Sequence, residues 1–248
     1  MDEFDVPESH PRYESLRTRH RIEAGVEQGI TSTAGLVAQG RGEAFDYLLG
    51  EETIPSADEA ERVAAAHLLA DHAVISVNGN VAALAPEAVG DLAEATGADV
   101  EVNLFNRTPE RMQAIVDHLA AHGITDVKGL AADARIPGLD HERAKIDADG
   151  IYDADVVLVP LEDGDRAEAL GEMGKTEIVI DLNPLSRSSN AAAVPVVDNL
   201  VRALPNMTAH AEALADTAAE DLERLVAEFD PDAARRDAER AIRTGELD

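Results

Sequence analysis

Side chains that can bind an anion follow one buried strand in this sequence. Residues 178–180 are apolar and β-branched, as expected for a buried parallel strand, and Asp181 marks its end. Ser186, Arg187 and Ser188 stand in the loop that follows. Because ligands bind outside the carboxyl ends of parallel strands, two hydroxyls and a guanidinium here predict a site for nucleotide phosphates. An ordinary turn with solvated polar residues is the alternative interpretation.

A second group of cations lies near the amino terminus. The pattern of residues 10–21 predicts a helix that is ended by Gly29. This segment contains Arg12, Arg17, Arg19 and Arg21. In a chain with 50 acidic and 21 basic residues, clustered arginines favour a phosphorylated ligand. Ion pairs with acidic neighbours such as Glu14 and Glu23 are the alternative.

Arg41 is a further candidate for phosphate binding. Gly40 and Gly42 flank it, which predicts close approach of the backbone to a ligand beside a planar, bidentate donor. A plain turn before a helix would show the same spacing.

Residues 131–153 form a polar segment that is too long for a simple connection. Connections of this length inside compact domains are usually functional or disordered. The segment concentrates basic side chains, namely Arg135, His141, Arg143 and Lys145. We therefore expect it to close over the ligand.

The elements that must position these residues predict an α/β fold of one domain. Apolar runs predict six strands, at 73–77, 99–105, 127–130, 155–160, 178–180 and 194–197. Helices are predicted from Ser56, with Glu59 completing a capping box, and from Pro109, with Thr108 as its cap. The expected arrangement is a mostly parallel, Rossmann-like sheet over residues 73–206, with helical additions at 1–72 and 207–248.

Charge and composition exclude several classes of protein. The formal net charge is −29, which disfavours nucleic acid and anionic membranes as partners. Lysine is almost absent, and acidity with so little lysine resembles proteins of salt-loving organisms. The chain has no cysteine and no apolar run of membrane-spanning length, so we expect a cytoplasmic protein.

Two other motifs imitate nucleotide-binding loops. Residues 171–176 resemble the end of a P-loop, but Ala169 replaces its first glycine and a strand follows, so a helix end with a turn is predicted. Residues 106–108 resemble a segment that binds the 2′-phosphate of NADP. However, the further glycines of the dinucleotide-binding motif are missing after Gly79. An NADP-dependent oxidoreductase is therefore the alternative enzyme, and a non-catalytic nucleotide-binding sensor is the alternative from another class.

Taken together, the chain resembles the archaeal 4-phosphopantoate–β-alanine ligase family, also called phosphopantothenate synthetase. The resemblance runs from Ser9 to about Met207 through SHPRY, GRGEAFDYL, VISVNGNVAAL, RIPGLDHER, VPLEDGDR, IDLNPLSRS and VDN. It implies a Rossmann-like homodimer that condenses 4-phosphopantoate with β-alanine, using ATP and Mg²⁺, to form 4′-phosphopantothenate, AMP and diphosphate. It also favours a phosphopantoyl adenylate as the intermediate in this step of coenzyme A synthesis.

The resemblance assigns the ATP contacts, and residue types alone suggest the other candidates. It places ATP contacts on Arg19, Arg41, Asp181, Leu182, Asn183, Arg187, Ser188, Asn199 and Leu200. Candidates for the phosphate of phosphopantoate are Arg107, Arg135, Arg143 and Lys145. His10 or His141 could assist deprotonation of the amine, and Asp163, Asp165 and Asp181 are available carboxylates for magnesium. No nucleophile is expected, because activation of a carboxylate by ATP needs charge and alignment rather than a covalent residue.

Overall fold

A six-stranded parallel sheet organises the molecule, which a computed structural model describes over residues 6–70, 72–161 and 164–246. The strands are β1 (Ala73–Val77), β2 (Asp99–Val102), β3 (Val127–Lys128), β6 (Val156–Pro160), β7 (Thr176–Ile180) and β8 (Val194–Val196), in the order β3-β2-β1-β6-β7-β8. The expected α/β, Rossmann-like arrangement is confirmed. The chain reverses direction across the sheet between β1 and β6, which creates a topological switch point there.

Both faces of the sheet are buried, and successive residues of a strand face different hydrophobic cores. Val74 pairs with Val157 in the register of β1 and β6, and both pack into one core. Ile75 and Leu158, which pair one position further along, pack into the other core. This double burial explains why the strands are continuous apolar runs.

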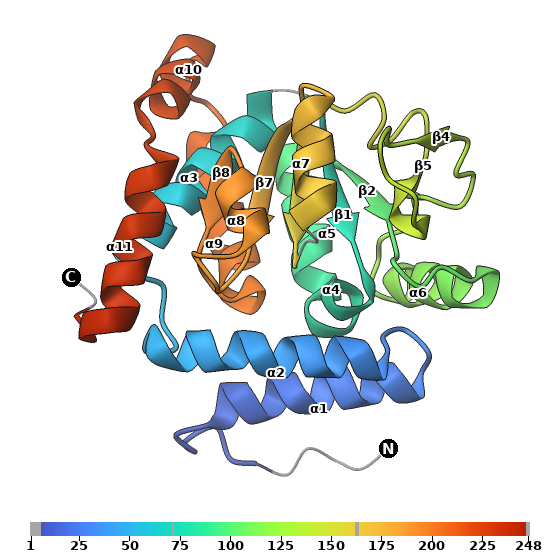
Figure 1. Cartoon of the computed structure of the whole chain (residues 1–248), viewed down its shortest axis with the longest axis horizontal. Coiled ribbons are helices and arrows are strands. Elements are labelled where there is room, and N and C mark those ends of the chain that lie inside the picture. Colours follow the sequence, from blue (N-terminus) through green and yellow to red (C-terminus); the bar gives the residue numbers. More distant parts are fainter. Residues whose placement is uncertain (1–5, 71, 162–163, 247–248) are drawn as a thin grey trace.

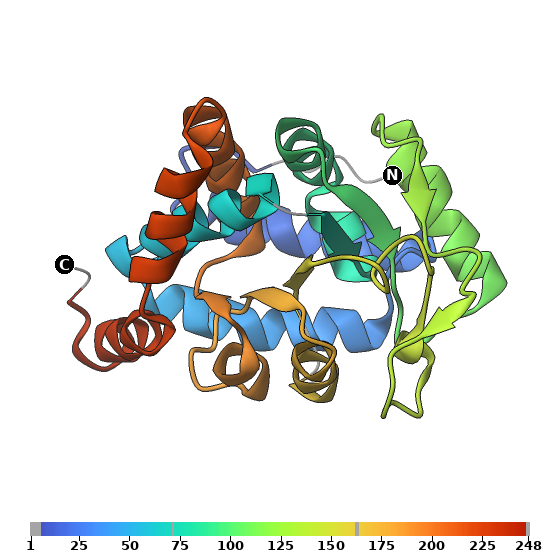
Figure 2. The same cartoon turned by 90° about the horizontal axis from the view of Figure 1, so that it is seen from above.

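Helices cover the two faces unequally. One core contains residues of α3 (Pro55–Ala70), α4 (Gly79–Leu84), α5 (Pro86–Thr96), α6 (Pro109–Ala121) and α9 (Leu200–Leu214). The opposite side carries α7 (Gly164–Glu172) and α8 (Arg187–Ala191), as Figure 2 shows. Thr108 caps α6 as predicted. The capping box at Ser56 was wrong, because α3 already begins at Pro55 and the amides of its first turn bond to the carbonyl of Ile54.

Two amino-terminal helices run together below the sheet in the view of Figure 1. They are α1 (Tyr13–Glu27) and α2 (Thr33–Leu48), and Ser32 caps α2. The alternative interpretation of residues 40–42 as a plain turn before a helix was wrong, because these residues lie inside α2. Glycine weakens a helix in isolation, but here the packing of α2 on the rest of the fold outweighs that local preference.

Residues 131–153 form a packed hairpin and not a lid. Strands β4 (Ala134–Arg135) and β5 (Lys145–Ile146) pair antiparallel, with the short 3-10 helix η1 (Glu142–Ala144) before β5. Ile136, Ile146 and Ile151 are buried against the sheet. The expectation of a loop that closes over the ligand is therefore corrected, since these apolar side chains hold the segment in place.

The carboxyl-terminal tail is helical, as predicted. It continues from α9 through α10 (Ala219–Glu228) to α11 (Pro231–Thr244), so the boundary expected at residue 207 falls inside α9. Ala238 and Ala241 of α11 share a small core with Leu182 and Val197, which follow β7 and β8. The tail thereby supports the loops at the carboxyl edge of the sheet. Among the described residues, no helix is long and apolar enough to cross a membrane.

Candidate active site

A cavity of about 380 Å³ lies where β7 and β8 end. We call it the β7–β8 cavity. Its walls come from the loops after β6, β7 and β8 and from α2, which crosses the carboxyl edge of the sheet. Most of the residues expected to contact ATP meet in this cavity: Arg41, Asp181, Leu182, Asn183, Ser188, Asn199 and Leu200.

Short-range hydrogen bonds hold the loop after β7 in shape. Asp181 Oδ1 accepts from the amide of Asn183 at 2.9 Å, and Asn183 Oδ1 accepts from the amide of Leu185 at 3.0 Å. Ser186 then caps α8 by accepting from the amide of Ser189. Burial raises the pKa of Asp181, although bonds from Ser186 and Asn183 oppose that shift. The loop thus offers a rigid, polar wall without help from a ligand.

A network of side chains joins α2 to the loop after β8. Asn199, the cap of α9, donates through Nδ2 to Asp46 Oδ2 at 2.7 Å. Arg202 bridges Asp46 at 2.6 Å and Asp198 at 2.5 Å. Asp198 also accepts from Thr53 Oγ1 at 2.6 Å. Because these contacts link residues more than 140 positions apart, they fix the position of α2 over the cavity.

The expected phosphate-binding arginines differ in their present partners. Arg41 lines the cavity, is exposed, and forms no ion pair within the part of the chain that the structure describes. Arg187 lies outside the cavity, where its guanidinium pairs with Glu168 at 3.0 Å. Arg19 also lies outside it and pairs with Glu43 at 2.6 Å.

A second cavity, of about 230 Å³, adjoins the first at the topological switch point. We call it the switch-point cavity. Ala38 and Leu161 line both cavities, so the two lie side by side. Leu161 has a φ of 59°, a left-handed conformation that costs a residue other than glycine about 1 kcal/mol. Such strain persists mainly at functional sites.

Of the four residues expected to hold the substrate phosphate, Arg143 lines the switch-point cavity. Arg107, Arg135 and Lys145 line neither cavity; they bond to the carbonyl of Gly129, the carbonyl of Leu139 and the carboxylate of Glu142, respectively. Sequence reasoning missed Arg111, which does line the switch-point cavity. The sequence could have indicated Arg111, because this residue lies in the first turn of α6, directly after the loop that follows β2.

The structure also locates the residues considered for proton transfer and for metal binding. His141 pairs with Asp165 at 3.0 Å, and neither lines the two cavities, nor does His10. Asp163 lies outside the described residues. Asp181 is the magnesium candidate that faces a cavity. A separate group, Asp58, Glu61 and His210, has metal-ligand spacing, but none of its members lines either cavity.

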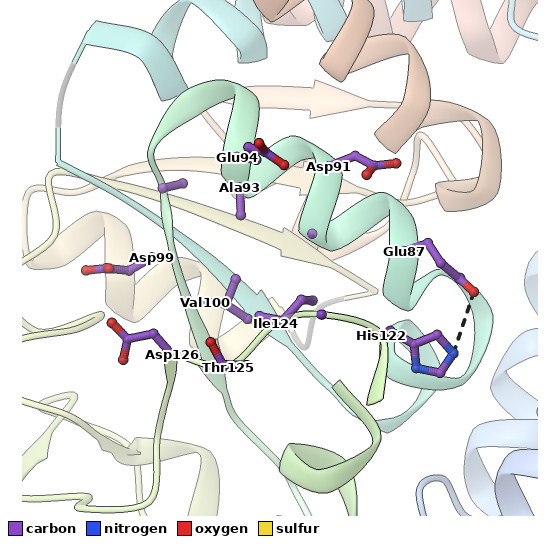
Figure 3. Close-up of a pocket in the computed structure, with 13 residues that line it drawn as sticks. Glu87, Asp91, Ala93, Glu94, Asp99, Val100, His122, Ile124, Thr125 and Asp126 are labelled. Atoms are coloured by element: carbon purple, nitrogen blue, oxygen red, sulfur yellow. Dashed lines mark ion pairs between the residues drawn. The ribbon is translucent and has the colours of Figure 1, made fainter. Parts of the chain in front are cut away.

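Another surface groove, of about 490 Å³, lies at the opposite, amino end of the strands. Figure 3 shows that its walls carry Glu87, Asp91, Glu94, Asp99 and Asp126, with His122 paired to Glu87 at 3.5 Å. A wall of carboxylates repels phosphates, and the carboxyl edge is where open parallel sheets bind ligands. The candidate site is therefore the pair of adjacent cavities, the β7–β8 cavity and the switch-point cavity.

Comparison with known proteins decides the family. A profile of the family described as phosphopantothenate/pantothenate synthetase matches residues 56–245. The chain belongs to this family. Among its relatives, a protein of Methanosarcina mazei is 56% identical over 91% of this chain and 89% of its own length. A Thermococcus kodakarensis protein is 54% identical over 91% of this chain and 87% of its own length. Both carry the name 4-phosphopantoate–β-alanine ligase.

A third relative with the same name, from Methanospirillum hungatei, is 59% identical over 82% of this chain and 83% of its own. The resemblance noted in the sequence is thus confirmed, and the oxidoreductase alternative loses its basis. The first two relatives each align with 91% of this chain.

Proposed function

We propose that this protein joins 4-phosphopantoate to β-alanine at the expense of ATP, yielding 4′-phosphopantothenate, AMP and diphosphate. The observation that carries the proposal is the pair of adjacent cavities at the carboxyl edge of the sheet. One cavity has the position of a nucleotide site, and its neighbour contains arginines. The names of the relatives supply the identity of the reaction.

ATP occupies the β7–β8 cavity in this proposal. Asp181, Asn183 and Asn199 are suited to the ribose and base, since they present carboxylate and amide groups on braced loops. Arg41 binds the phosphates from α2, and Ser188 donates from α8. Arg187 joins them by leaving Glu168, because an exposed ion pair of this kind contributes only about 0–1 kcal/mol.

Activation of the carboxylate follows from this placement. The carboxylate of phosphopantoate, entering from the switch-point cavity, attacks the α-phosphorus of ATP, and diphosphate leaves as the bond between the α- and β-phosphates breaks. The amine of β-alanine then attacks the acyl carbon of the adenylate and displaces AMP, releasing a proton to solvent. Proximity and electrostatic stabilisation suffice, and no residue becomes covalently attached.

The donor set also accommodates magnesium. Mg²⁺ usually binds to substrate phosphates and to one or two carboxylates, and Asp181 offers a carboxylate on the wall of the β7–β8 cavity. Bound there, the ion would neutralise charge on the phosphates, while Arg41 would hold the same phosphates from α2.

The products and an isotope exchange test this function. In molar potassium chloride, ATP, 4-phosphopantoate and β-alanine should yield AMP and diphosphate. Without β-alanine, labelled diphosphate should exchange into ATP, and the exchange should require Mg²⁺. Formation of ADP and inorganic phosphate would overturn the adenylate mechanism. Exchange would also fail if diphosphate stayed bound until β-alanine arrives. The identity of the products, AMP and diphosphate or ADP and inorganic phosphate, therefore decides between the two mechanisms.

A further inference from the structure

We propose that the switch-point cavity binds the phosphate group of the phosphorylated hydroxy acid through Arg111, with Arg143 on the same cavity wall. This inference rests on the proposed function and names the subsite that the function requires. The nucleotide cavity already has its own cation, Arg41. A second phosphorylated substrate needs separate positive charge, and the adjoining cavity supplies it.

Arg111 is the residue that carries the argument. Its Nε donates to the carbonyl of Ile30 and its Nη1 to the carbonyl of Asn106, both at 3.2 Å. It has no carboxylate partner among the described residues, although acidic residues outnumber basic ones by more than two to one. Partial burial lowers the pKa of Arg111, and no anion offsets that effect. A half-buried guanidinium held only by neutral carbonyls, at the wall of a cavity, is suited to bind an anionic ligand.

The sequence around β1 is shaped to admit this side chain. A Cβ at Gly79 would lie 2.4 Å from the carbonyl oxygen of Ile30 and 2.6 Å from Arg111 Nη2, so a larger residue there would displace both the backbone at Ile30 and the guanidinium that bonds to it. Asn78 and Asn80 line the same cavity. The motif at residues 78–80, which imitates an incomplete dinucleotide fingerprint, therefore has a different use: it leaves room for Arg111 beside the cavity.

Arg143 reaches the cavity because the hairpin is anchored to the end of β2. Asn103, which is fully buried, donates through Nδ2 to the carbonyls of Arg143 at 3.2 Å and Lys145 at 3.0 Å. Its Oδ1 accepts from Arg143 Nε at 3.3 Å. These bonds orient Arg143 rigidly, which favours recognition of a phosphate in one defined position.

The placement also satisfies the geometry of the reaction. The hydroxy acid carries its phosphate at one end and its reacting carboxylate at the other. With the phosphate near Arg111, the carboxylate can extend past Ala38 and Leu161 into the β7–β8 cavity.

The test measures binding of 4-phosphopantoate without ATP, by calorimetry in molar potassium chloride, to the whole protein and to Arg111→Met. Loss of a charged hydrogen-bonding partner should weaken binding about 10- to 100-fold. Binding of ATP, and of pantoate without its phosphate, should stay within about threefold of wild type. Arg111→Lys keeps the positive charge but loses the two parallel N–H donors of the guanidinium. It should therefore bind 4-phosphopantoate more tightly than Arg111→Met and more weakly than wild type.

Arg135→Met is the matched control, since it removes an exposed arginine of the neighbouring hairpin that lines neither cavity. The proposal is overturned if Arg111→Met binds 4-phosphopantoate like wild type, if Arg135→Met weakens binding equally, or if Arg111→Met loses ATP binding as well. A turnover assay on the same wild-type sample keeps the two proposals apart. Binding that depends on Arg111 without formation of AMP would overturn the ligase function and leave this subsite in place.

Discussion

At the scale of single residues, the arginines near the β7–β8 cavity have different roles before ATP arrives. Arg41 already lines the cavity and has no competing carboxylate among the described residues. Arg187 is 67% exposed and is held by Glu168 at the rim, against the backbone of Gly164. Phosphates can displace this carboxylate at little cost, because solvent screens the pair.

We therefore predict that Arg187→Ala lowers kcat/KM severely, by about 100-fold or more, since contacts to the phosphates strengthen as charge develops in the transition state. Arg187→Lys should restore only part of the activity, because one ammonium cannot reproduce the bidentate fork. Steady-state kinetics with saturating β-alanine measures both variants.

The control for this measurement is Arg224→Ala. Arg224 is 63% exposed and pairs with Asp221 on α10, so its removal changes the net charge equally but lies away from both cavities. It should leave the kinetic constants unchanged. If Arg187→Ala also behaves like wild type, the loop after β7 does not bind phosphates through this residue.

At the scale of secondary-structure elements, α2 is the wall that both cavities share. Its position depends on the network of Asp46, Arg202 and Asp198, and Glu61 of α3 lies next to that network. Glu61 is fully buried, and its Oε2 accepts from Asn206 at 2.9 Å. Burial and the neighbouring charge of Asp198 raise the pKa of Glu61 well above its ordinary value. We therefore expect Glu61 to keep its proton in the folded protein at neutral pH.

This shift predicts how stability depends on pH. Above the ordinary pKa, the unfolded chain releases a proton that folded Glu61 retains, so the free energy of unfolding falls as the pH rises. Glu61→Gln removes this titration. Between about pH 5 and about pH 8, wild type should lose stability more steeply than the variant, by about 1 kcal/mol per pH unit.

Denaturant unfolding in molar potassium chloride at several pH values measures the two slopes. Glu59→Gln, a change at an exposed position of the same helix, is the control and should keep the wild-type slope. Equal slopes for wild type and Glu61→Gln would show that Glu61 is ionised in the folded protein.

At the scale of the whole molecule, the net charge of −29 dominates. Ion pairs such as Arg17 with Glu14 and Arg243 with Glu239 neutralise only part of it. Val37, Tyr47 and Leu48 are exposed apolar side chains of α2, and the homodimer that the family resemblance implies would need an apolar surface of this kind. Both the fold and such an association must overcome repulsion between carboxylates.

Transfer from molar salt to tens of millimolar should therefore unfold the protein or dissociate the homodimer that the family resemblance implies, because the screening length grows from about 3 Å towards about 30 Å. Thermal unfolding and light scattering across a potassium chloride series measure the two effects. A thermal midpoint that does not change over this range would contradict the interpretation that the chain is adapted to high salt.

The sequence by itself determined the α/β class, the six strands and the residues at their carboxyl ends. Those features are local: an apolar run identifies a buried strand, and the loop after it must lie at the edge where ligands bind. Asp181, Asn183, Ser188 and Asn199 met in one cavity for this reason. The cap at Thr108 could likewise be predicted, because a cap depends on neighbouring residues alone.

The tertiary structure alone decided which cations face the cavities. Arg143, and not Arg135 or Lys145, reaches the switch point because Asn103 anchors the hairpin from another strand. Arg111 enters through the space beside Gly79. The helical state of Gly40–Gly42 was likewise decided by packing, against the local preference of glycine. Such contacts join residues far apart in the chain, so no spacing or periodicity encodes them.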